Sequence, residues 1–131
     1  MEVLSSRVIV YARDFDRSVG WYDDVLGLAR YREFGTGGRI TGVVYFLGAG
    51  FLEVSSHGED FGAADGSVRV WLQVRDVDAE LARLAAAGAT VLEEAADRPW
   101  GLREAWVADP DGLRLCLVQV PDDHPLRRDR R

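Results

Sequence analysis

The chain has 131 residues, of which 47% are hydrophobic and 29% charged, with a formal net charge of −6. This balance is typical of a globular protein with one domain, or with two small halves that share a core. No apolar run approaches the ~20 residues that span a bilayer, and an acidic chain without a basic stripe is a poor nucleic-acid binder. We therefore expect neither a membrane nor a nucleic-acid partner.

The first half is predicted to contain a strand, a helix and three further strands. Residues 8–11 are β-branched or aromatic and predict the first strand. Asp14 or Asp16 is the expected N-cap of the next helix, and Gly27 its expected end. Three strands are then predicted at 29–34, 40–47 and 50–55. Residues 57–67, rich in glycine and aspartate, are expected to be a linker.

The second half repeats this order. Residues 68–74 predict a strand, and Asp76 or Asp78 is the expected N-cap of a helix whose apolar stripe is Leu81, Leu84 and Ala85. Gly88 follows that helix as its expected end. The remaining strands are predicted at 89–94, 103–108 and 113–120. The tail is placed at 121–131, and its arginine-rich end, 125–131, is expected to be disordered.

An internal repeat relates the two halves. Arg13-Asp14-Phe15-Asp16 matches Arg75-Asp76-Val77-Asp78, and the same offset carries Arg7 onto Arg69. We therefore predict an α+β fold of two tandem βαβββ modules, at about 3–56 and 68–120, within a single domain over 1–131. A sheet with one helix behind it leaves its other face apolar, so the two curved mixed sheets are expected to surround a cavity.

Three stretches of this pattern resemble the vicinal oxygen chelate superfamily. They are RDFDRSVGWYDDVLGL at 13–28, the strand around Glu53, and PWGLREAWVADPDGLRL at 99–115. The superfamily includes glyoxalase I, extradiol dioxygenases, fosfomycin resistance enzymes and bleomycin-binding proteins, and the resemblance covers about residues 3–120. It implies the vicinal oxygen chelate fold, but functions differ so widely among members that the fold does not choose one.

The resemblance also implies where a metal site would be. Metal-dependent members use His or Gln on the first strand and Glu on the last strand of each half. The matching positions here are Arg7, Glu53, Arg69 and Cys116. Arginine offers no lone pair, and one carboxylate and one thiol fall short of a zinc or iron site. Neither His57, in the linker, nor His124, in the tail, matches a ligand position, so we predict no metal and no other cofactor.

Strand alternation predicts which side chains face the cavity. They are Arg7, Ile9, Tyr11, Phe51, Glu53, Ser55, Arg69, Trp71, Gln73, Arg114, Cys116 and Val118. We assign ligand binding to Arg7, Tyr11, Glu53, Arg69, Trp71, Gln73, Arg114 and Cys116. The resemblance adds Trp100 and Gly101, since a Trp-Gly pair borders the drug groove of bleomycin-binding members.

Three features of this surface need separate consideration. Glu53 between Arg7 and Arg69 is expected to form a charge-assisted cluster, which could orient a ligand or could merely replace a structural metal. Cys116 is expected to be an inert core thiol. Trp106 could face either side of its strand.

Two functional hypotheses follow. The first is a metal-free protein of the bleomycin-resistance type that sequesters a planar aromatic small molecule such as an antibiotic. The second is a metal-independent enzyme, similar to a lyase or isomerase, with Glu53 as general base. No nucleophile–base pair is evident, so the first is favoured and no catalytic residue is assigned.

The resemblance implies a homodimer. A lone cysteine and the absence of a signal peptide favour the cytoplasm.

Overall fold

The computed structural model describes residues 1–56 and 67–126. The chain divides into two compact units, Met1–Ala63 and Ala64–Arg131. Most of the predicted linker, including His57, and the last five residues of the predicted tail lie outside the described residues. Among the described residues, no helix combines the length and apolar character needed to cross a membrane.

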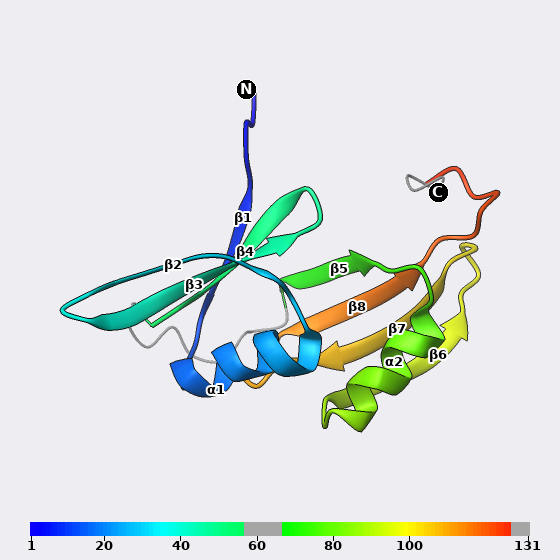
Figure 1. Ribbon diagram of the computed structural model, residues 1–131. Helices are drawn as coiled ribbons and strands as arrows, with labels where there is room; N and C mark the ends of the chain where they lie inside the picture. Colours follow the sequence, from blue (N-terminus) through cyan, green and yellow to red (C-terminus); the bar gives the residue numbers. More distant parts are fainter. Residues whose placement is uncertain (57–66, 127–131) are drawn as a thin grey trace. The chain divides into compact units, whose positions relative to one another are not determined.

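The first unit is a four-stranded mixed sheet with its helical segment on one face (Figure 1). Its elements are β1 (Arg7–Tyr11), α1 (Phe15–Gly20), η1 (Trp21–Leu26), β2 (Arg30–Thr36), β3 (Arg39–Leu47) and β4 (Gly50–Ser55). The strand order is β1-β4-β3-β2, with β1 parallel to β4 and the other pairs antiparallel. The βαβββ order predicted for this half is confirmed.

The helical segment of the first unit begins as predicted and then changes type. Asp14 caps α1, because its side-chain oxygen accepts a hydrogen bond from the backbone N–H of Arg17 at 3.1 Å. At Trp21 the α-helix becomes the π-helix η1, which ends at Gly27 with φ 78°. Tyr22 and Leu26 are both buried in η1. A positive φ at this position favours glycine, which explains why the segment ends there.

The second unit repeats the architecture. Its elements are β5 (Arg69–Gln73), α2 (Val77–Ala86), β6 (Thr90–Asp97), β7 (Arg103–Ala108) and β8 (Arg114–Gln119). The strand order is β5-β8-β7-β6, and α2 packs on β6, β7 and β8 (Figure 1). Asp76 caps α2 by accepting from the N–H of Ala79 at 3.0 Å. Leu81 and Leu84 are buried as predicted, whereas Ala85 is exposed and Val77 takes its place in the core.

Together the two units are the tandem βαβββ arrangement that the repeat predicts. Each sheet has one face covered by its own helix and one face turned away from it, which we call the open face. In the first unit Leu52 and Val54 of β4 are buried among the core residues, and they alternate with Phe51 and Glu53. The open faces therefore carry the side chains that sequence alternation assigned to the cavity.

Candidate functional site on the open faces

Strand pairing fixes which open-face residues are neighbours in the first unit. Arg7, Ile9 and Tyr11 of β1 are the Cα partners of Phe51, Glu53 and Ser55 of β4. Partners in register project from the same face of a sheet. The predicted members Arg7, Tyr11 and Glu53 therefore lie on one surface.

Arg7 and Glu53 form an ion pair at the centre of this surface. The Arg7 Nη1 donates to Glu53 Oε2 at 2.9 Å, and the Glu53 side chain is only 10% exposed against 38% for Arg7. A buried carboxylate is costly unless it is paired, so Arg7 is what allows Glu53 to be here. The predicted third member of this cluster, Arg69, belongs to the second unit, and its approach to Glu53 stays a prediction.

An aromatic cluster surrounds the ion pair. The rings of Tyr31, Phe46 and Phe51 lie 4.9–5.9 Å apart, and the Arg7 guanidinium is 6.0 Å from the centre of the Phe51 ring. Tyr31 and Phe46 are about half exposed, at 50% and 48%. Large rings that are held in place yet remain exposed provide a surface on which a flat molecule can stack.

Phe34 completes this surface by lying across β3. Its partner in the register is Gly42, and a Cβ built on Gly42 would be 2.0 Å from the Phe34 ring. Gly42 is therefore required for the ring to lie flat against the strand. Sequence reasoning missed Tyr31, Phe34 and Phe46. Alternation along β3 places Phe46 beside Phe51. Alternation does not predict the face from which Tyr31 projects, because the register of β2 shifts between Arg30 and Arg32.

The second unit has a matching open face with different side chains. Arg69, Trp71 and Gln73 of β5 pair with Arg114, Cys116 and Val118 of β8, so the predicted members of this unit's strands also share one face. Cys116 also pairs with Trp106 of β7, and the Arg69 guanidinium lies 5.4 Å over the Trp106 ring. Trp106 therefore belongs to the open face, which settles the side that the sequence left open.

Cys116 lies in an apolar cluster between the two tryptophan positions. It is 1% exposed and groups with Leu102, Val118 and Val120, with Trp106 packed against them. Burial, reinforced by the negative charge of Glu104, raises the pKa of the Cys116 thiol to about 12. A protonated buried thiol is a poor nucleophile and a poor metal ligand. The inert character predicted for Cys116 agrees with this environment.

Trp100 is tied to a buried carboxylate that sequence reasoning missed. Its indole Nε1 donates to Glu104 Oε2 at 2.8 Å, and Arg98 Nε lies 3.8 Å from the other oxygen of Glu104. Glu104 is 7% exposed and projects from the open face as the partner of Val118. Trp100 itself is 59% exposed, so the bond holds one edge of an otherwise accessible ring.

The first part of the tail, before its arginine-rich end, contacts this same loop. His124 Nε2 lies 3.4 Å from the Trp100 carbonyl oxygen, and its Nδ1 accepts from the N–H of Leu126 at 3.1 Å. A Cβ on Gly101, whose φ is +88°, would be 3.2 Å from the His124 ring. His124 therefore packs against this loop, because Gly101 leaves room for its ring.

The donor sets of the open faces do not fit a metal ion. In the first unit the Glu53 carboxylate already accepts a hydrogen bond from Arg7. In the second unit Arg69 shares the open face with Cys116, whose buried thiol is protonated. Neither guanidinium can ligate a cation. Within 1–56 and 67–126, no three His, Cys, Asp or Glu side chains are grouped so that they could hold a metal.

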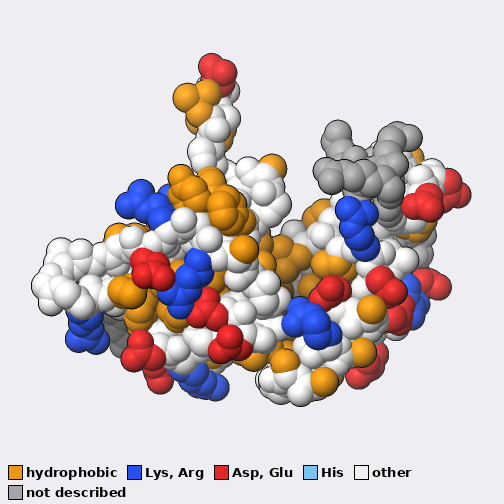
Figure 2. All heavy atoms as spheres, in the orientation of Figure 1, with side chains coloured by type: hydrophobic (Ala, Val, Ile, Leu, Met, Phe, Trp, Pro, Cys, Tyr) orange, Lys and Arg blue, Asp and Glu red, His pale blue; other side chains and the backbone are white. Residues whose placement is uncertain are grey.

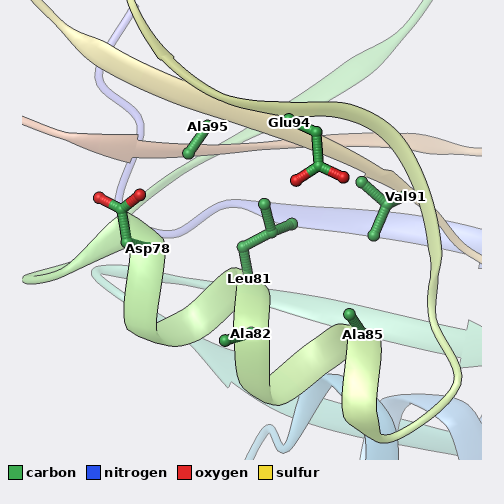
Figure 3. Close-up of a pocket in the computed structure, with 7 residues that line it drawn as sticks. All are labelled: Asp78, Leu81, Ala82, Ala85, Val91, Glu94 and Ala95. Atoms are coloured by element: carbon green, nitrogen blue, oxygen red, sulfur yellow. The ribbon is translucent and has the colours of Figure 1, made fainter.

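A separate depression of about 230 Å³ lies between α2 and β6, on the helix side of the second sheet (Figure 3). Leu81 and Val91 line it, and the carboxylates of Asp78 and Glu94 point toward it from α2 and β6. Arg103 donates two hydrogen bonds of 2.7 Å to Asp78 and lowers the pKa of that carboxyl group. This depression is on the opposite side of the sheet from Arg69, Trp71 and Cys116.

The sequence pattern of the Glyoxalase/Bleomycin resistance protein/Dioxygenase superfamily matches residues 5–117 of the chain. The chain belongs to this superfamily. Glyoxalase-superfamily relatives are also found among solved structures, whereas no curated protein matches the chain.

Three of these structures illustrate the likeness. TioX from Micromonospora sp. ML1 is 27% identical, with 92% of this chain and 97% of that one covered and a TM-score of 0.68. A glyoxalase-related enzyme from Fulvimarina pelagi is 24% identical, with coverages of 93% and 91% and a TM-score of 0.73. TnmS3, an antibiotic binding protein from Streptomyces sp. CB03234, is 23% identical, with coverages of 92% and 98% and a TM-score of 0.74. The last two likenesses concern the fold alone.

Proposed function

We propose that this superfamily member is a metal-free protein that binds and sequesters a planar aromatic small molecule, such as an antibiotic. One observation carries the proposal. At the positions that correspond to metal ligands in metal-dependent members, the open faces have the Arg7–Glu53 ion pair, Arg69 and the buried Cys116. Aromatic rings flank the two arginines, with Phe51 beside Arg7 and Trp106 beside Arg69.

The exposed rings supply the area that such a ligand needs. Hydrophobic side chains reach the surface of both units (Figure 2), and the rings of Tyr31, Phe46 and Trp71 are each about half exposed. An aromatic pair contributes roughly 0.5–1.5 kcal/mol beyond the burial of its area, so each stacking contact adds to the affinity that burial of the ligand's rings supplies. TnmS3 supports the proposal only in showing that a protein of this fold can bind an antibiotic.

The alternative of a metal-independent enzyme receives less support. A general base needs a carboxylate oxygen that can reach a substrate proton. In Glu53 the Oε2 atom already accepts from Arg7, and Cys116 is a buried thiol unsuited to act as a nucleophile.

We also propose that the protein is a homodimer, because each sheet has edge strands that can pair with another chain. Light scattering at micromolar concentration would measure its mass. The lone cysteine favours a cytoplasmic location.

A binding screen with product analysis tests the proposed function. The purified protein is titrated with flat polycyclic aromatic compounds, antibiotics among them, while tryptophan fluorescence and melting temperature are followed. We expect saturable binding, recovery of the compound with its mass unchanged, and no stoichiometric metal. Trp71→Ala should weaken binding about tenfold, the loss of one stacking contact. Leu92→Ala, which removes another exposed apolar side chain in the same unit, is the control.

Two results would contradict the proposal. A changed mass in the recovered compound would show an enzyme. Binding that Trp71→Ala and Leu92→Ala weaken equally would show that the open face of the second unit is not the ligand surface.

A further inference from the structure

We infer that Arg69 and Arg114 form an anion-binding subsite, and that the ligand is therefore an aromatic acid. The inference rests on the proposed function and adds the chemical class of the ligand to it. It starts from the place where the two arginines lie in the second sheet. They are Cα partners in the parallel pair β5–β8.

Partners in register on adjacent strands start only about 4.8 Å apart, and their side chains leave the sheet on the same side. Val70 and Leu115, the next residue on each strand, are buried, whereas Arg69 and Arg114 are exposed. Both guanidinium groups therefore extend from the open face. Two like charges in this position repel each other, and an anion between them would relieve the repulsion.

The described residues of the second unit offer these two arginines no carboxylate. Elsewhere in the chain Arg7, Arg30, Arg98 and Arg103 each form an ion pair. Within 67–126, the described part of their own unit, neither Arg69 nor Arg114 has an acidic side chain at ion-pair distance.

In the first unit a carboxylate neutralises the arginine at the corresponding position. Its matching pair is Arg7 and Phe51, so only one cation is present, and Glu53 neutralises it. In the second unit the glutamate position is Cys116 and the phenylalanine position is Arg114. The substitution thus removes a negative charge and adds a positive one. The second open face has two cations where the first has a neutral pair.

The subsite borders the aromatic surface directly. Trp71 follows Arg69 by two residues on β5, and the Arg69 guanidinium lies 5.4 Å over the Trp106 ring. Stacking on an aromatic face leaves the N–H groups in the guanidinium plane free to donate two parallel hydrogen bonds to a carboxylate. A flat acid could therefore place its rings against Trp71 and its carboxylate between Arg69 and Arg114.

A matched pair of probes separates charge from stacking. The probes are 2-naphthoate and 2-naphthamide, which share one ring system and differ in the anion. We expect the acid to bind at least about tenfold more tightly to the wild-type protein, as two charge-assisted bonds imply. Arg114→Met should remove this preference and leave the affinity for the amide unchanged. Arg114→Lys, which keeps the charge but not the paired donors, should retain part of it.

Arg39→Met is the matched control, because Arg39 is also an exposed strand arginine and its loss changes the net charge equally. It should leave both affinities unchanged. Equal binding of acid and amide by the wild type would overturn the subsite while the aromatic binding surface stands. Failure of both probes to bind would overturn the proposed function together with the subsite. Sulfate tests the remaining source of an anion. If sulfate displaces bound 2-naphthoate as effectively as an excess of 2-naphthoate itself does, the subsite binds free anions in general. The assignment of an aromatic acid is then wrong.

Discussion

The two units share one strand order and one pairing register, yet their open faces have different chemistry. The first places a neutral Arg7–Glu53 pair among exposed rings. The second places Arg69 and Arg114 side by side, next to Trp71 and a buried Cys116. The backbone of the repeat has thus been kept while matched side chains have diverged. One open face thus offers a neutral aromatic surface and the other a cationic one.

This difference has a physical basis in what each position can bury. Glu53 is 8% exposed to solvent and lies beside a guanidinium. Cys116 is 1% exposed and packs among Leu102, Val118 and Val120. A carboxylate is tolerated in the first environment and an uncharged group in the second. Exchanging side chains between matched positions should therefore have unequal costs.

The most severe test transfers the glutamate of the first unit to the second. Cys116→Glu should destabilise the protein by about 3 kcal/mol at neutral pH, because the carboxylate enters an apolar cluster near Glu104. Cys116→Gln has nearly the same shape without the charge, so the difference between the two variants in urea denaturation isolates the electrostatic part. If Cys116→Glu is as stable as Cys116→Gln, the second unit can accept the ion pair and the contrast between the units fails.

A smaller effect is expected from removing the matched arginines. Arg7→Met leaves Glu53 buried without its partner and should cost about 1–2 kcal/mol of unfolding free energy. Arg69→Met breaks no ion pair among the described residues of the second unit and should cost less than about 1 kcal/mol. The double variant Arg7→Met with Glu53→Leu should recover much of the first loss. Equal costs for the two single variants would show that Arg69 has the structural role assigned to Arg7.

The smallest effect is the part of the alkaline pH dependence that Cys116 of the second unit contributes. The folded-state pKa of Cys116 is raised to about 12 from an ordinary value of 9.0, so the unfolded chain loses this proton first as pH rises. Its contribution to stability is complete below pH 9 and is lost progressively between pH 9 and 12. At pH 10 the loss should be about 1 kcal/mol. Cys116→Ala should show a shallower alkaline decline in urea denaturation; an unchanged slope would contradict the assignment.

The parts of this fold that were predicted correctly depend on local rules. Asp14 and Asp76 cap their helices through a hydrogen bond to a residue three positions later, which the sequence displays directly. Alternation along a strand likewise needs no knowledge of the partner strand, and it placed Arg7 with Glu53 on one face. The repeat then extended both arguments to the second unit.

The parts that were missed depend on contacts distant in sequence or on local irregularity. Glu104 could be linked to Trp100 only once the turn between β6 and β7 brought the two together. The packing of His124 against Gly101 joins the tail to a loop more than twenty residues away. The change from α1 to η1 at Trp21 has no clear signal in the apolar spacing. Tyr31 projects from a bulged strand, where alternation no longer applies.

All strand pairs described in the two sheets lie within one half of the chain, and this affects the order in which the protein can fold during synthesis. β1 pairs with β4 in the first sheet and β5 with β8 in the second, with no strand exchanged between the sheets. The ribosome translates β1 through β4 before it reaches α2. The first sheet can therefore complete its hydrogen bonding while the second half is still being made, as contiguous domains do. Slow synthesis of the second half would lengthen that interval without leaving any strand of the first sheet waiting for a partner.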